Sequence, residues 1–252
     1  MRDMVSEALP DSRFFGLPLL ASDPGIGITR YDRLRRLRRT LKGFWKGYRT
    51  FREAVVWEKI ARRAKDGDII SGHLRYGSPQ LPGLDLQYIT LLRNPIERLI
   101  SDYHYSRHGY LKRSFLQRSY GKGVLRVAGT RSLSDYIHYI HAHRRAFGNP
   151  ATSYIVGPNT GEDPFEFMRR NYFHFGVLEE MECFSTQLAQ KLQRPVAATW
   201  SNKTRRTADH RLSPNDMVLL EELLDRDIPL YQKTLGCVRA AKAGQPVIGR
   251  EV

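Results

Sequence analysis

A strand-to-helix junction, LQYITLLRNPIERLISDYHY, constrains the fold of this chain more than any other stretch. Residues 86–93 hold Tyr, Ile, Thr and Leu in one short apolar run that ends in arginine, which predicts a buried strand. Asn94 is a favourable N-cap, Pro95 suits the first helical position, and Glu97 lies three residues beyond the cap. These signals predict a helix that continues to about Tyr105.

The junction places Arg93 beside a helix start, where an anion is well accommodated. A helix start offers backbone N–H groups and the positive end of a dipole. The guanidinium fork of an arginine matches a phosphate or sulfate. Ser101 follows two turns along the helix, and its hydroxyl can donate to the same anion. The alternative is a capped helix with Arg93 in a surface ion pair, and the residues alone leave both interpretations open.

Strand-like and helix-like segments alternate along the rest of the chain. Further strands are predicted at 67–73 and 171–179, and further helices at 132–143, 181–192 and 213–224. Such alternation predicts an α/β fold with a mostly parallel sheet, in which ligands bind at the carboxyl ends of strands. Residues 227–235 predict one more turn, and 237–252 are expected to form a loose tail.

The N-terminal part of the pattern is less regular. Residues 2–9 carry an apolar helical stripe that Pro10 ends, and no strand precedes it. A loop rich in Pro and Gly is expected over 16–29, and helix in two pieces over 31–65. The basic, Gly-containing residues 106–131 are expected to be loop-like in part.

Positive charge is concentrated in one segment. The chain has a formal charge of +15, and residues 30–65 hold 14 Lys/Arg against 3 Asp/Glu. This segment is either a solvated helical face or a surface for polyanions such as acidic glycans, anionic lipid headgroups or nucleic acid. Its aromatic residues have the spacing of a packing stripe, and no nucleic-acid motif accompanies them. Nucleic acid is therefore not an expected partner, whereas peripheral membrane contact stays open.

The sequence predicts a cytoplasmic protein. No apolar run reaches the roughly 18 residues that span a bilayer, and the first residues lack the apolar core of a signal peptide. Two cysteines, Cys183 and Cys237, cannot form a disulfide framework, although one bridge is not excluded. The histidines show no metal-ligand spacing, so no metal is implied.

The junction resembles the 3′-phosphate-binding segment of sulfotransferases that use 3′-phosphoadenosine-5′-phosphosulfate (PAPS). It is most similar to the carbohydrate-type enzymes, in the group that includes heparan sulfate 2-O-sulfotransferase. The matching positions are Arg93, Pro95, Arg98, Ser101, Tyr103 and Tyr105. The resemblance implies that Arg93 and Ser101 bind the 3′-phosphate of PAPS, and it leaves a structural role open for Arg98.

Other segments resemble this family in the same order along the chain. ISGHLRYG (70–77) is similar to the stretch that carries a catalytic histidine, which implies that His73 is the general base. SNKTRRT (201–207) resembles a loop that closes over the nucleotide. That similarity implies phosphate or ribose contacts by Asn202, Arg205, Arg206 and Thr207. Two further segments are similar to family segments: FHFGVLEEMECFSTQL (173–188), and the C-terminal segment that contains Asp227, Leu230 and Tyr231.

The resemblance implies one sulfotransferase-like domain over 1–236, with a P-loop-like parallel sheet flanked by helices. The implied reaction moves a sulfuryl group from the co-substrate PAPS to a hydroxyl of a glycan or glycolipid. The basic segments 30–65 and 106–131 favour an anionic acceptor.

One family element has no counterpart. The Gly-rich loop that holds the 5′-phosphosulfate, roughly Pro-Lys-x-Gly-(Gly)-Thr-Ser, is not matched, and DPGIGITR (23–30) lacks its basic residue. Residues 2–9 resemble the helix that follows this loop, so the first strand and the loop are expected to be missing. A truncated or misassigned start would leave an enzyme whose 252-residue form is inactive. The alternative is a non-catalytic, sulfotransferase-like protein that binds acidic glycans or membrane surfaces.

Overall fold

The structure is a computed structural model that describes residues 14–16, 60, 62–65, 67–71, 74–77, 85–115, 118, 123–159, 161–196 and 212–243. Its strands are β1 (Phe14–Gly16), β2 (Ile69–Ser71), β3 (Tyr88–Leu92) and β4 (Tyr172–Val177). Its helices are α3 (Pro95–Leu111), α5 (Val124–Thr130), α6 (Leu133–Ala142), α7 (Arg144–Phe147), α8 (Pro150–Val156), α9 (Pro164–Asn171), the short 3₁₀ helix η2 (Leu178–Glu180), α10 (Met181–Leu192), α11 (Pro214–Leu223) and α12 (Asp227–Lys242). Helices dominate this part of the chain, and its short strands pair in parallel, so the coarse class is α/β.

The strands form two parallel pairs, β1 with β2 and β3 with β4. The predicted strands at 67–73, 86–93 and 171–179 are confirmed as β2, β3 and β4. Strand β1 was not predicted, because three residues are too few to show the alternation that marks a strand. A register shift between Tyr88 and Ile89 gives β4 an extra residue at its start.

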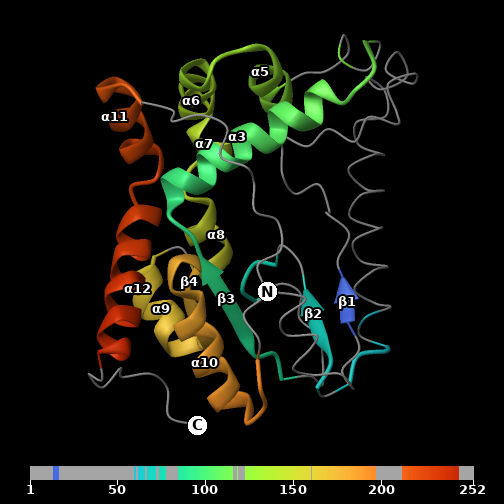
Figure 1. Cartoon of the computed structure of the whole chain (residues 1–252), viewed down its shortest axis with the longest axis vertical. Coiled ribbons are helices and arrows are strands. Elements are labelled where there is room, and N and C mark those ends of the chain that lie inside the picture. Colours follow the sequence, from blue (N-terminus) through green and yellow to red (C-terminus); the bar gives the residue numbers. More distant parts are fainter. Residues whose placement is uncertain are drawn as a thin grey trace.

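Helices cover both faces of the β3–β4 pair (Figure 1). Helix α10 packs on one face, where Phe184 and Leu188 meet Leu91 from β3. Helices α8, α9 and α12 cover the other face, around a core that includes Leu92 and Val177. Burial on both faces is typical of parallel strands.

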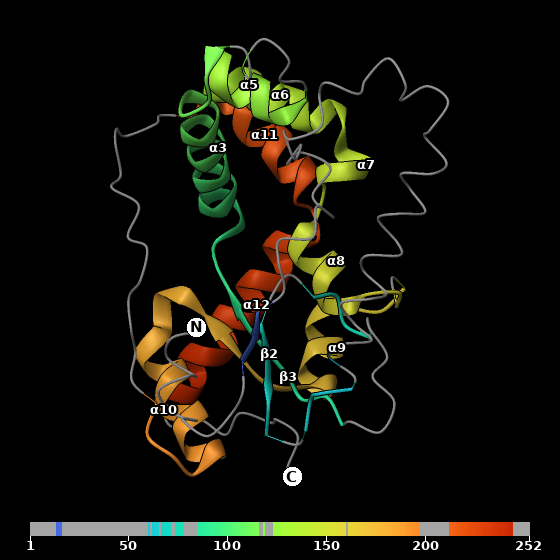
Figure 2. The same cartoon turned by 90° about the vertical axis from the view of Figure 1, so that its right-hand side faces the viewer.

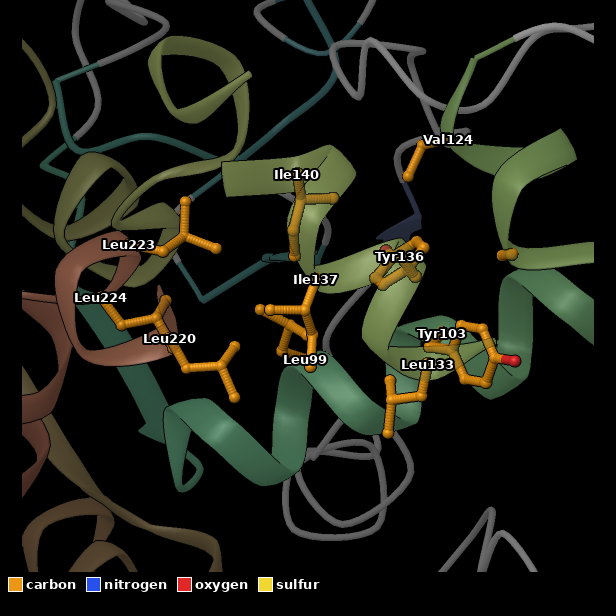
Figure 3. Close-up of a cluster of buried hydrophobic side chains, with 11 residues drawn as sticks. Leu99, Tyr103, Val124, Leu133, Tyr136, Ile137, Ile140, Leu220, Leu223 and Leu224 are labelled. Carbon is orange, nitrogen blue, oxygen red and sulfur yellow. The ribbon is translucent and has the colours of Figure 1, made fainter. Parts of the chain in front are cut away.

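A second core joins α3, α5, α6 and α11 (Figure 3). Leu99 and Tyr103 from α3 meet Ile137 from α6 and Leu220 from α11. Figure 2 shows these four helices at one end of the molecule and the strands with α9 and α10 at the other. Helix α8 and the start of α12 lie between the two ends. Three of the four helices of the second core, α3, α5 and α6, belong to the long connection from β3 to β4.

The starts of α3, α6, α10 and α11 were predicted, whereas α7, α8 and α9 were not, and some helix lengths were missed. The capped helices at 132–143 and 213–224 are confirmed as α6 and α11. Helix α3 runs six residues past the expected Tyr105, and α5 lies inside the segment expected to be partly loop. The expectation of a loose tail from 237 is wrong for 237–242, because α12 continues to Lys242.

Three remaining predictions concern the chain as a whole. The expected helix at 2–9, most of the expected helix over 31–65 and most of the expected loop over 16–29 lie outside the described residues. The helix is wrong for 62–65, which form a turn and irregular chain, and the loop is wrong for Gly16, which ends β1. Cys183 and Cys237 are both free thiols. Within the described ranges, no helix is both long and apolar enough to cross a bilayer.

Candidate functional site

The carboxyl ends of β3 and β4 bring two loop segments together, as parallel pairing requires. Arg93 and Asn94 follow β3, and η2 follows β4. The backbone N–H of Asn94 donates to Oε1 of Glu179 at 3.2 Å, which ties the two strand ends to each other. The residues predicted to bind an anion therefore lie at the edge where an α/β sheet usually binds ligands.

The start of α3 is closed by its own cap. The Asn94 side chain accepts hydrogen bonds from the N–H groups of Ile96 at 3.0 Å and Glu97 at 3.2 Å. The N–H of Arg98 donates to the Asn94 carbonyl at 2.9 Å, and Pro95 has no N–H. The prediction that this helix start offers free N–H groups to an anion is therefore wrong. An anion here must be bound by side chains.

Arg93 keeps a partly exposed side chain with one weak ion pair. Its Nη2 lies 3.8 Å from Oε2 of Glu97, and the Arg93 side chain is 34% exposed. That separation is too long for a hydrogen bond, and an exposed pair of this kind contributes little. The surface ion pair that the sequence left open is present. It leaves the guanidinium fork available to a stronger anion.

Ser101 lies on the same side of α3 as Arg93. Glu97 and Ser101 lie four residues apart on α3 and so share one helical stripe, and Arg93, which precedes the N-cap, reaches that stripe through its contact with Glu97. Ser101 is half-buried, and its hydroxyl forms no hydrogen bond to the residues that the structure describes. The structure thus brings Arg93 and Ser101 to one side of α3, with the Glu97 carboxylate between them.

Two other matched positions of the junction, Arg98 and Tyr103, are structural. Arg98 approaches Asp102 at 4.0 Å, and its charge partly opposes the rise that burial causes in the pKa of Asp227. Tyr103 is 4% exposed, and its hydroxyl donates to the Arg131 carbonyl at 3.0 Å. Arg98 and Tyr103 therefore support the helix packing. Tyr105, by contrast, is 69% exposed.

Carboxylates make this strand edge mixed in charge. Glu179 is a residue of the candidate site that the sequence did not predict, although its place after β4 was a usable signal. Burial, and then the Glu179 carboxylate, raises the pKa of Tyr231 to about 12. Glu180 pairs with Lys242 at 3.1 Å and Arg239 at 3.2 Å, and these cations lower the pKa of Glu180. Glu97 and Glu179 are thus the carboxylates that an anion beside Arg93 would meet.

Asp227, Leu230 and Tyr231, in the C-terminal segment that resembles the family, have structural roles in the fold. The carboxylate of Asp227 accepts the N–H groups of Ala151 at 2.9 Å and Thr152 at 2.7 Å, and so caps α8 from the start of α12. Burial raises the pKa of Asp227. Leu230 and Tyr231 belong to the core beside the β3–β4 pair.

The remaining predicted site residues lie outside the described residues: His73, Asn202, Arg205, Arg206 and Thr207. Beyond His73 the described residues resume at Leu74, and the N–H of Tyr76 donates to the Tyr154 carbonyl at 2.9 Å. Within the described residues, no group of three or more His, Cys, Asp or Glu side chains forms a metal site.

No family model, curated protein or solved structure matches this chain.

Proposed function

We propose that this chain is a PAPS-dependent sulfotransferase that transfers a sulfuryl group to a hydroxyl of a glycan or glycolipid. The proposal includes a P-loop-like parallel sheet, and it rests on the resemblance of the segment from Arg93 to Tyr105. The observation that carries it is the position of Arg93 and the unengaged Ser101 hydroxyl on one side of α3, at the carboxyl end of β3.

In the proposed reaction, Arg93 and Ser101 bind the 3′-phosphate and orient the nucleotide. The acceptor oxygen attacks sulfur, the bond from sulfur to the 5′-phosphate oxygen breaks, and 3′-phosphoadenosine-5′-phosphate (PAP) leaves. His73 takes the proton of the acceptor hydroxyl, for which a neutral imidazole is suited near pH 7. Asn202, Arg205, Arg206 and Thr207 close over the nucleotide in this proposal. Because the cap of α3 uses the backbone N–H groups, the phosphate depends on side chains alone.

Binding of PAP tests the proposal without knowledge of the acceptor. Saturating PAP should raise the Tm of the full chain by about 5 °C, because a ligand that binds only the folded state stabilises it. Arg93→Ala should abolish that rise. Arg145→Ala, at an exposed position on α7, is the matched control and should keep it. A chain whose Tm ignores PAP, or an Arg93→Ala variant that responds like the wild type, would overturn the proposal.

A second candidate is a non-catalytic protein of the same fold that binds acidic glycans or membrane surfaces. It is favoured by the closed helix cap and by the carboxylates of Glu97 and Glu179, which oppose a doubly charged phosphate beside Arg93. The same titration separates the two candidates. Stabilisation by a sulfated polysaccharide together with no response to PAP would select the binding protein.

A further inference from the structure

The C-terminal half of α3 and the residues just beyond it carry exposed apolar side chains. Figure 1 shows this half of α3 pointing away from the end of β3. Tyr105 is 69% exposed, Leu111 is 49% exposed, and Phe115, just beyond the helix, is 79% exposed. The only other large apolar side chain this exposed among the described residues is Val218 on α11. Three of these four side chains therefore fall within one stretch of eleven residues, and Leu111 and Phe115 lie at its end.

A shallow hollow of about 330 Å³ lies between this end of α3 and α5. It is lined by Tyr110, Leu111, Phe115, Arg118, Arg126, Gly129 and Thr130. Leu111 and Phe115 thus form an apolar wall, and two arginines contribute to the same depression. Exposed apolar side chains and cationic side chains therefore line the same hollow.

The chain segment that forms this end of α3 and α5 has basic residues and no acidic ones in its sequence. Residues 103–134 contain seven Lys/Arg and no Asp or Glu. Arg107 is engaged inside the fold, since its Nη1 donates to the Ala128 carbonyl at 3.2 Å and the Arg131 carbonyl at 3.3 Å. Lys112 and Arg126 are exposed and form no ion pair with the residues that the structure describes. Cations that the fold does not neutralise therefore flank the apolar side chains.

We infer that the surface formed by Leu111, Lys112, Phe115 and Arg126 docks on an anionic membrane. Exposed apolar side chains gain from insertion below lipid headgroups, while cations beside them are attracted to anionic headgroups. This pairing favours a lipid surface over an acidic polysaccharide, which would attract the cations but would not bury Leu111 and Phe115. The surface lies roughly 25 Å along α3 from Arg93, since each helical residue adds about 1.5 Å. Membrane docking therefore does not depend on the proposed nucleotide site.

Vesicle sedimentation of the full chain, without nucleotide, tests this inference. The chain should bind phosphatidylcholine vesicles that contain about 30% phosphatidylglycerol. Its affinity for pure phosphatidylcholine vesicles should be at least about tenfold lower. Raising NaCl from about 0.1 M to about 0.5 M should release most of the bound protein, because salt screens the lysine and arginine charges.

Paired variants separate the two contributions. Leu111→Ser with Phe115→Ser, and separately Lys112→Gln with Arg126→Gln, should each weaken vesicle binding at least about fivefold. Val218→Ser and Arg145→Gln change an exposed apolar and an exposed basic residue outside the surface, and should bind like the wild type. An unchanged Tm in each variant confirms that the exposed substitutions leave the fold intact.

Three results would overturn the inference. One is equal binding to neutral and anionic vesicles. Another is full binding by both double variants. The third is no vesicle binding together with binding of heparin that Phe115→Ser leaves unchanged, which would assign the cations to an acidic polysaccharide.

Discussion

His174 is the buried histidine of β4, and its environment favours the neutral imidazole. The residue is 3% exposed, and its Nε2 lies 2.9 Å from the Phe184 carbonyl oxygen of α10. Burial lowers the pKa of His174 to about 4, and the Lys191 ammonium adds to this effect. The ring therefore packs as a neutral donor between strand and helix.

This shift predicts a loss of stability in mild acid. The unfolded chain binds a proton at His174 near pH 6.5 and the folded chain only near pH 4, so stability falls as pH drops through that window. The full effect is about 3 kcal/mol. We expect urea unfolding between pH 7 and pH 4 to show it, and His174→Gln to remove this part of the pH dependence. An equal pH slope in the variant and the wild type would contradict the assignment.

At the scale of one element, α5 and α3 approach each other at Gly129. A Cβ on Gly129 would lie 2.0 Å from Cδ1 of Tyr110, whose side chain is 6% exposed and cannot move aside. Helix α12 offers the opposite case, because a Cβ on Gly236 would meet nothing within 4 Å. The two glycines therefore stand in helices for different reasons.

The pair gives a prediction with its own control. Gly129→Ala should lower the free energy of unfolding by about 1–3 kcal/mol through overpacking. Gly236→Ala should raise it by about 0.5–1 kcal/mol, because alanine is the better helix former. Chemical denaturation measures both. A destabilised Gly236→Ala variant would mean that α12 does not continue through this position.

The starts of α3, α6 and α11 were predictable because their signals are local. Asn94, Ser132 and Ser213 cap the helices that follow them, as their side chains and the residues three positions later indicate. Helix α8 was not predicted, because the carboxylate that caps it belongs to Asp227, far along the chain. The length of α12 was missed for a similar reason. Val238 packs against the rest of the fold, although Gly236 suggests a helix end.

The candidate site was predictable only in part, for the same physical reason. The position of Arg93 after a strand follows from the local sequence. The nearness of Glu179 depends on the parallel pairing of β3 with β4, which joins residues 85 positions apart. The closed cap of α3 also shows that a favourable N-cap and a free anion site compete for the same N–H groups.

At the scale of the whole molecule, a formal charge of +15 places many cations near one another. Repulsion between like charges destabilises a compact state, and dissolved salt screens that repulsion. The Tm should therefore rise as NaCl is added from low ionic strength. This rise in Tm with NaCl depends on all the charges together. The loss of one exposed arginine should therefore change it little.

Sulfate separates the proposed anion site from this general effect. At equal ionic strength, sulfate should raise the Tm more than chloride does, both because it is excluded from protein surfaces and because Arg93 and Ser101 bind it. Exclusion acts on every variant alike, so the difference between wild type and Arg93→Ala isolates binding at the site. We expect that difference to be about 2–4 °C and Arg145→Ala to show none, measured as Tm in matched sulfate and chloride series. If Arg93→Ala keeps the whole advantage of sulfate, then exclusion accounts for it and the pairing of Arg93 with Glu97 is purely structural.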